Sequence, residues 1–372
     1  MDSVTHLAAG ALTPLAFSRA PRMWPLVFFG ITAGILPDID ILAGSSAHAM
    51  FSIHRGLTHS ILSISTAALL LALSFKFFLS NLHVKNDAVR VVDGLAVIAR
   101  PDDWSLGQIF LVALLGLGLH LYLDCMTSFG TQIFWPFSNY RVAVPALFIV
   151  DPLLTIPLLI ILFYCLRNFK SRAKLAAQVT WARYAIFWAL LYPLICLGIH
   201  EGLSRKFNRD YTEVGTAAEK ITLTPVLFSP FYWKAVAENS EEYRMQWVAT
   251  HKFSTRPHFD PPAYSKVPPR LWQRLAEVLP IFGEYREFAH FPTLESTINP
   301  QGLKELTFKD LRYIYSLPNF LKECLGTDDG LFHLQARLGK DNRVYAWRYL
   351  GWESTIRDTA WEDLHPAPIL PE

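Results

Sequence analysis

Residues 106–124 read LGQIFLVALLGLGLHLYLD, an apolar run that carries His120 and Asp124 at its end. A bilayer crossing needs about 20 largely apolar residues, so this run predicts a transmembrane helix. The histidine and the aspartate are four positions apart, which places them one helical turn apart on the same face, where both can bind one ion. Ionisable groups at the depth of lipid are costly and usually mark function. The pair alone is weak evidence, because a hydrogen bond that stabilises the helix explains it equally well.

The composition of the chain places this helix in a larger membrane region. Of its 372 residues 52% are hydrophobic, the mean hydropathy is +0.24, and the apolar residues are concentrated before residue 200. A soluble protein is rarely so apolar. Further crossings are expected at 60–80, 146–166 and 181–200, with two weaker ones at 3–17 and 23–42. We therefore expect a mainly α membrane protein, with a bundle of about six transmembrane helices in residues 1–204 and a soluble α+β domain in residues 205–372.

Basic residues in the short loops predict the orientation of the bundle, because cytoplasmic loops carry an excess of Lys and Arg. The loop after residue 166 contains Arg167, Lys170, Arg172 and Lys174 and no acidic residue, so we expect it to be cytoplasmic. With six crossings, both termini and the soluble domain then lie outside the cytoplasm. In this orientation the histidines and aspartates at the helix ends all fall on the outer face. The orientation follows from Lys and Arg alone, so this agreement is independent support.

The motif HRGLTHS at 54–60 is a stronger metal signal than the His120–Asp124 pair on the helix at 106–124. Gly56 permits a turn, Thr58 is expected to cap the helix that follows, and His59 then falls in the first turn of that helix. His54 and His59 can share one centre only if His54 lies in the preceding loop. The alternative is two interfacial histidines that bind backbone carbonyls.

The motif LPDID at 36–40 brings Asp38 and Asp40 to the end of another apolar run. Each unpaired carboxylate at membrane depth costs roughly 2.5 to 3.5 kcal/mol, so a cation is expected beside them. Helix capping would explain one aspartate, less readily both. His6 follows Thr5 as His59 follows Thr58, although alone it would be read as an ordinary buried polar residue.

These runs together supply imidazoles and carboxylates at one membrane face. The expected metal ligands are His6, Asp38, Asp40, His54, His59, His120 and Asp124. This set suits zinc, with manganese or iron as alternatives, and differs from the oxygen cages of calcium. It exceeds what one tetrahedral ion uses, so we expect two ions that share a bridging carboxylate and keep open positions for water. Such a centre stabilises the attacking and leaving oxygens of a phosphoester.

Arg55 and Asp38 are the candidate catalytic residues. Arg55 lies between the histidines of HRGLTHS, and its guanidinium matches the oxygens of a phosphate, although contact with a lipid headgroup explains it equally well. Asp151 lies at the same outer face and could support a ligand histidine or Arg55 from behind. His48 and Thr127 lie nearby in sequence and receive no role.

The runs THLAAG, LPDID, HRGLTHS and HLYLDCMTSFGTQIFWPFS, in this order, resemble the YdjM-type inner-membrane proteins, which are regarded as metal-dependent hydrolases. The resemblance covers residues 1–165 well and the remainder loosely. It implies a helical bundle in a bacterial inner membrane, related to the zinc-dependent phospholipase C and single-strand nuclease group, with the matching histidines and aspartates as metal ligands. Phosphoester hydrolysis is implied by the resemblance and the number of ligands, and the substrate is not specified by either.

The tail after residue 205 has a different pattern. Alternation predicts strands at 232–238 and 243–251, joined as a hairpin, and a second hairpin of 332–338 with 344–350. Helical patterns occur at 271–278 and 308–325. Aromatic residues such as Trp233 and Trp347 are interpreted mainly as core. Cys324 is the only cysteine of the tail, so no disulfide within it is possible.

The sequence is compatible with two classes of function. The favoured one is a metal-dependent hydrolase of a small-molecule or lipid phosphoester, or of a lipid-linked ester, at the outer membrane face, with membrane lipid as its partner. The alternative is a noncatalytic membrane protein with a structural metal and a partner-binding tail; a transporter with a midplane site is less favoured because the ligands gather near one face. The net charge of +2 gives no reason to expect nucleic acid.

Overall fold

The computed structural model describes residues 1–18, 24–44, 46–81, 104–168, 172–214, 220–227, 229–250, 262–314, 331–351 and 360–370. The chain divides into two compact units. The first, called here the helical unit, comprises Met1–Asp40, Arg55–Gly202 and Pro225–Tyr232. The second, called the α+β unit, comprises Ile41–His54, Leu203–Thr224 and Trp233–Glu372.

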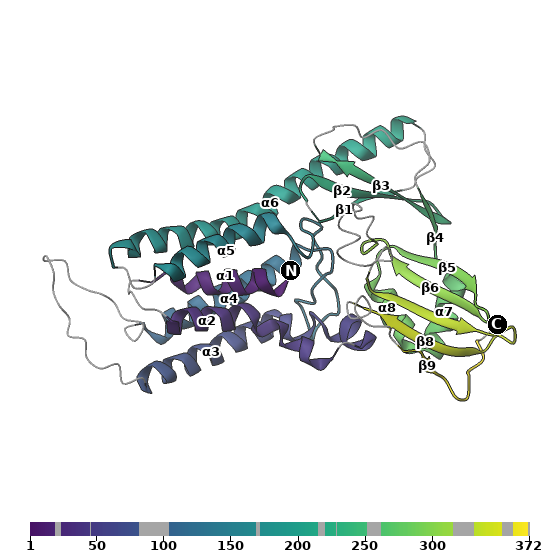
Figure 1. Cartoon of the computed structure of the whole chain (residues 1–372), viewed down its shortest axis with the longest axis horizontal. Coiled ribbons are helices and arrows are strands. Elements are labelled where there is room, and N and C mark those ends of the chain that lie inside the picture. Colours follow the sequence, from purple (N-terminus) through teal and green to yellow (C-terminus); the bar gives the residue numbers. More distant parts are fainter. Residues whose placement is uncertain are drawn as a thin grey trace, which may run out of the picture. The chain divides into compact units, whose positions relative to one another are not determined.

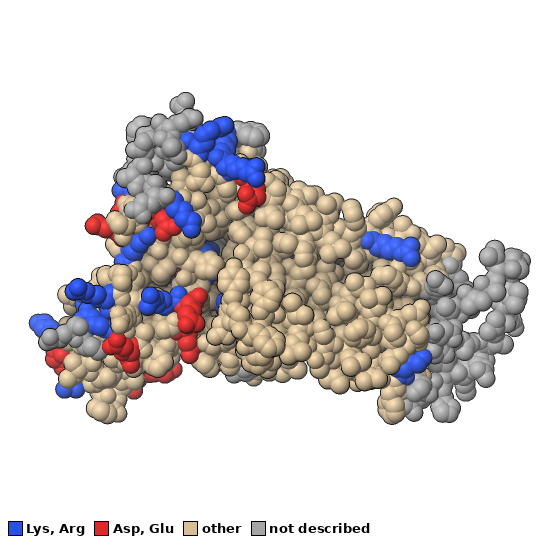
Figure 2. All heavy atoms as spheres, turned by 180° about the vertical axis from the view of Figure 1, so that it is seen from behind, with Lys and Arg blue, Asp and Glu red and all other residues tan. Residues whose placement is uncertain are grey.

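The helical unit is a bundle (Figure 1). Its helices are α1 (Ser3–Leu15), α2 (Trp24–Ile35), α3 (Ile61–Asn81), α4 (Leu106–Cys125), α5 (Pro152–Arg167) and most of α6 (Leu175–Val214). Four described segments are long and apolar enough to cross a membrane: Trp24–Leu42, Ile61–Leu79, Leu106–Cys125 and Leu175–Arg209. On the face drawn in Figure 2, charged side chains are sparse over the helices and gather over the α+β region. The membrane bundle is confirmed, whereas α1 has 13 residues and α5 has 16, so the count of six crossings is not.

Local signals determine where these helices begin and end. Ser105 starts α4 with a capping box. Its hydroxyl accepts from the backbone N–H of Gln108, and the side-chain oxygen of Gln108 accepts from the backbone N–H of Ser105. The helix expected from residue 146 begins later, at Pro152, because the carboxylate of Asp151 accepts from the first backbone N–H groups of α5. The α-helical part of α2 ends at Ile35, since Pro37 disfavours helical backbone before it.

Glycines allow α1 and α2 to pack with their backbones in contact. A Cβ atom built at Gly30 would lie 2.3 Å from the carbonyl oxygen of Gly10, and one built at Gly34 would lie 2.3 Å from the carbonyl oxygen of His6. Either distance is far below van der Waals contact, so any side chain at these positions would force the helices apart. The close crossing places the start of α1 beside the end of α2.

Short irregular helices follow α2. They are the 3-10 helix η1 (Leu36–Ala43), the π-helix η2 (Ala49–Ile53) and the 3-10 helix η3 (Leu57–His59). Ser60 then caps α3, because its hydroxyl accepts from the backbone N–H of Ser63 at 3.1 Å. The prediction that Thr58 caps this helix was wrong, and His59 lies in η3 just before α3.

In its described residues, the α+β unit has two antiparallel sheets, the short helices α7 (Pro269–Val278) and α8 (Pro280–Phe288), the segment with η2, and the end of α6. The four-stranded sheet has the order β1 (Lys220–Pro225), β2 (Tyr232–Glu238), β3 (Glu242–Ala249), β4 (Ala263–Ser265). The five-stranded sheet has the order β5 (Pro292–Ile298), β6 (Lys304–Asp310), β7 (His333–Leu338), β8 (Val344–Leu350), β9 (Glu362–Asp363).

Most sequence predictions for this unit are confirmed. Both expected hairpins form, as β2 with β3 and β7 with β8, and α7 covers the helix expected at 271–278. The helix expected at 308–325 is wrong at its start, because Phe308 and the two residues after it end strand β6, paired with β5 and β7. Residues 315–325 lie outside the described part of the chain.

Candidate metal centre

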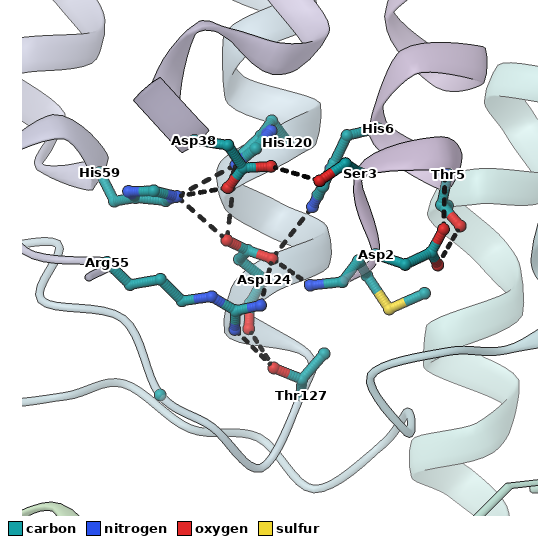
Figure 3. Close-up of polar contacts among 12 residues, drawn as sticks. Asp2, Ser3, Thr5, His6, Asp38, Arg55, His59, His120, Asp124 and Thr127 are labelled. Carbon is teal, nitrogen blue, oxygen red and sulfur yellow. Dashed lines mark hydrogen bonds and ion pairs between the residues drawn. The ribbon is translucent and has the colours of Figure 1, made fainter. Parts of the chain in front are cut away.

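The ends of three segments of the helical unit bring four side chains into one group. Asp38 comes from η1, His59 from η3, and His120 and Asp124 from the last turns of α4 (Figure 3). One ligand atom from each of them lies within 4.8 Å of the others, so the group could hold a metal ion. The sequence motifs that supply it lie far apart in the chain, and the predicted convergence of LPDID, HRGLTHS and HLYLD is confirmed for these four residues.

Five of the six distances between the four ligand atoms are close to those around a tetrahedral ion. His59 Nε2 lies 3.5 Å from Asp38 Oδ1 and 3.3 Å from Asp124 Oδ2. His120 Nε2 lies 3.6 Å and 3.5 Å from the same two oxygens. The two Nε2 atoms are 3.1 Å apart. With zinc–ligand bonds of about 2.0–2.1 Å, the edge of a tetrahedron is about 3.3 Å, so these distances match its edges.

Groups behind each histidine fix the direction of its ring. His120 Nδ1 lies 2.7 Å from the carbonyl oxygen of Gly34, which leaves Nε2 facing the group. His59 Nδ1 lies 3.3 Å from Asp40 Oδ2, and this oxygen also accepts from the hydroxyl of Thr58 at 3.1 Å. Backbone carbonyls and carboxylates commonly hold ligand histidines in this way. Asp40 therefore supports His59 from behind and stands outside the four-residue group.

The group is buried and carries excess negative charge. The side chains of His59, His120 and Asp124 are 0% exposed, and that of Asp38 is 11% exposed. Burial by itself would lower the pKa of His59, but the adjacent carboxylates of Asp124, Asp38 and Asp40 raise it to about 10. Among the described residues, no hydrogen bond reaches the buried Oδ2 of Asp124. An unbonded carboxylate oxygen at the centre of the group fits a bound cation. The cation would balance the negative charge and replace the proton of His59.

The second oxygen of Asp124 faces a different set of donors. Oδ1 lies 3.0 Å from Nη2 of Arg55 and 3.1 Å from Nε2 of His6, and the α-amino group of Met1 also contacts it. The ring of His6 stacks on that of His120 with centroids 3.6 Å apart. Asp124 thus joins the four-residue group to a second set of donors, which comprises Arg55, His6 and the α-amino group of Met1.

Arg55 is held firmly but retains one free donor. Its Nη1 donates to the hydroxyl of Thr127 at 2.9 Å, and that hydroxyl donates to the backbone carbonyl of Asp124 at 2.8 Å. The guanidinium carbon lies 4.7 Å from the ring centroid of Phe129. The Nε–H is buried and has no hydrogen-bond partner among the described residues. Thr127, for which the sequence indicated no role, is the residue that orients this arginine.

Three further residues noted in the sequence, His54, His48 and Asp151, are not members of the four-residue group. His54 is half-buried at the end of η2, and His48 pairs with Glu284 at 2.8 Å. Asp151 caps α5 and accepts from the hydroxyl of Tyr192 at 3.0 Å. Sequence reasoning missed Gly34 and Ser3, whose hydroxyl lies 3.5 Å from Asp38. A backbone carbonyl carries no sequence signal, and a lone serine carries hardly any.

Comparison with known proteins gives one result that bears on this centre. A family model described as YdjM inner membrane protein matches residues 1–202, which include every residue of the four-residue group. No curated protein matches the chain, and no solved structure matches it.

Proposed function

Because the chain belongs to the YdjM inner membrane protein family, we propose that it is an integral membrane metal-dependent hydrolase that cleaves a phosphoester or a lipid-linked ester. The observation that carries this proposal is the tetrahedral spacing of Asp38, His59, His120 and Asp124 beside a buried arginine. Metal centres of this composition, with an arginine that contacts one of the ligands, suit the cleavage of anionic esters.

Zinc is the proposed ion, with manganese or iron as alternatives, and the four-residue group would hold it. When bound, such an ion polarises the oxygen of an ester and makes a water molecule more acidic. The two-ion centre expected from the sequence stays a prediction. A second ion would have to use the other side of Asp124, where Oδ1 already contacts Arg55 and His6.

Two residues of the chain are proposed to handle the substrate. Arg55 would bind an anionic oxygen through its free Nε–H, while its Nη atoms stay on Asp124 and Thr127. Asp38 is the one ligand with an exposed fraction, so substrate and water would approach the group from its side. We further propose that this site faces the periplasm and meets membrane lipid, as the distribution of basic residues indicates.

One observation favours the alternative of a structural metal. Three of the four side chains are fully buried, and a closed set of four protein ligands is typical of structural zinc. In that case removal of the ion would unfold the helical unit, whereas a catalytic ion would be removed with the fold intact. Thermal unfolding of the chelated protein separates the two functions.

The test uses the full chain purified in detergent. Metal content is measured by mass spectrometry, and hydrolysis is assayed with bis(p-nitrophenyl) phosphate and with a phosphatidyl lipid in mixed micelles. We expect His59→Ala and Asp124→Ala to lose both metal and hydrolysis while the helical content is preserved. His365→Ala, at an exposed histidine of the tail, is the matched control and should behave as the wild type. Full retention of metal and of hydrolysis in both site variants would overturn the proposal.

A further inference from the structure

The two arms of the candidate metal centre are joined by a segment that belongs to the other unit. Asp38 and Asp40 end one stretch of the helical unit, and Arg55 begins the next, which contains His59. The residues between them, Ile41–His54, pack as part of the α+β unit. The chain therefore leaves the helical unit in the middle of the metal centre and returns to it.

The two ends of this segment, called here its neck, are linked by one carboxylate. Asp40 Oδ2 accepts from the backbone N–H of Arg55 at 2.9 Å and from the hydroxyl of Thr58 at 3.1 Å, and it lies 3.3 Å from His59 Nδ1. Arg55 has a positive φ of 57°, which is uncommon for a residue with a side chain and is maintained only where the surroundings impose it. The relative position of the two arms thus depends on the packing of α2 and α3 against α4, on these contacts of Asp40, and on the segment that joins the arms.

The tip of the excursion is anchored by Phe51. Its side chain is 3% exposed, and its ring centroid lies 5.1 Å from that of Tyr285, 5.0 Å from that of Phe288 and 5.3 Å from that of Tyr349. These contacts lie within the α+β unit and fix η2 on α8 and β8. A hydrogen bond between His48 Nδ1 and the carboxylate of Glu284, at 2.8 Å, adds an exposed second attachment.

We propose that Phe51 is a positioning residue for the metal centre. By anchoring the tip of segment 41–54 in the α+β unit, it restricts where Asp38 on one arm and His59 on the other can lie. A segment released from its anchor gains conformational entropy. Binding of the ion would then have to order the neck again, and this loss of entropy would weaken the affinity for the ion. The inference rests on the proposed function only in requiring that the centre bind an ion.

The test compares two truncations of buried aromatic residues in the same unit. Phe282, on α8, is 0% exposed and packs against Phe308 at 5.1 Å, so Phe282→Ala is the matched control for Phe51→Ala. Both full-length proteins are titrated with zinc against a chelator, and cobalt absorption reports the ligand geometry. We expect Phe51→Ala to weaken zinc binding by about tenfold or more, the range found when supporting residues of a metal site are removed. Phe282→Ala should stay within about threefold of the wild type.

Two milder variants keep the test decisive if Phe51→Ala folds poorly. Phe51→Leu retains most of the buried volume and should restore zinc affinity to near the wild-type value. Glu284→Ala removes only the exposed attachment and should weaken zinc binding slightly, with an unchanged melting temperature. Equal losses in Phe51→Ala and Phe282→Ala, or wild-type affinity in a folded Phe51→Ala, would overturn the inference. A wild-type protein that binds no zinc would instead overturn the proposed function, and the inference with it.

Discussion

The ring of His120 is directed by a backbone atom of another helix, because its Nδ1 lies 2.7 Å from the carbonyl oxygen of Gly34. The same glycine touches α1, since a Cβ at this position would lie 2.3 Å from the carbonyl oxygen of His6. Helix packing and ligand orientation therefore depend on the same residue.

Gly34→Ala should weaken zinc binding by about 10- to 100-fold, because separation of α1 from α2 moves the acceptor that orients His120. Zinc titration against a chelator measures the effect, and the melting temperature should fall as well. Gly118→Ala is the matched control, since a Cβ there has no atom within 4 Å and should be neutral or slightly stabilising. Equal zinc affinity in the two alanine variants would contradict the role of Gly34.

Asp40→Asn should lower zinc affinity by about tenfold without unfolding the protein, because the amide keeps an oxygen for Arg55 and Thr58 but removes the charge behind His59. The measurement is again a zinc titration, with circular dichroism as the check on folding. Asp363→Asn, at an exposed carboxylate of β9, serves as the control. Complete loss of the ion in Asp40→Asn would mean that Asp40 is itself a ligand.

Arg55→Lys should retain zinc and lose hydrolysis by about tenfold or more. A lysine keeps the positive charge beside Asp124, but it cannot contact Asp124 and Thr127 and still direct a third donor at an anion. Metal content and the rate of diester hydrolysis are measured on the same preparation. Unchanged hydrolysis in a zinc-loaded Arg55→Lys protein would remove Arg55 from the candidate catalytic residues.

The stability of the α+β unit should depend on pH through Lys234. Its ammonium is 0% exposed and donates to the carbonyls of Leu311 at 2.5 Å and Ile314 at 3.0 Å, and burial lowers its pKa from 10.5 to about 7. Between pH 7 and 10.5 the unfolded chain binds more protons than the folded one, so this group makes the free energy of unfolding rise with pH in that window. The slope is at most about 1.4 kcal/mol per pH unit, and the contribution is absent below pH 7.

Denaturation of the wild type and of Lys234→Met, followed by tryptophan fluorescence at several pH values, measures this difference. The variant should be less stable by about 1–3 kcal/mol near neutral pH, because carbonyls that accepted from Lys234 are left without a donor. It should also lack the rise above pH 7. Parallel curves for the two proteins would show that Lys234 does not titrate in this range.

Hydropathy predicted the long helices well, because the bilayer sets their length and composition. The expected crossings at 60–80 and 106–124 correspond to α3 and α4 within one residue at each end. The sequence pattern failed where pairing with distant strands decides the secondary structure. Phe308 fits a helical pattern by sequence, but pairing with β5 and β7 makes it part of a strand.

The candidate site was predictable in its residue types and less so in its geometry. Asp38 and Asp40 alternate with apolar residues, and nothing in that pattern shows which carboxylate faces the ion. Backbone in η1 directs Asp38 to the group and Asp40 to the far nitrogen of His59. The role of Phe51 could not be predicted either, because a phenylalanine beside a membrane helix is indistinguishable in sequence from one that faces lipid.

The excursion of residues 41–54 has a consequence for how the protein can be divided. The family match and the main part of the helical unit both end at residue 202, and a protein truncated there would keep every candidate ligand. It would nevertheless lack Tyr285, Phe288 and Tyr349, the aromatic socket of Phe51. If Phe51 is a positioning residue, the truncated protein should therefore bind zinc more weakly than the full chain.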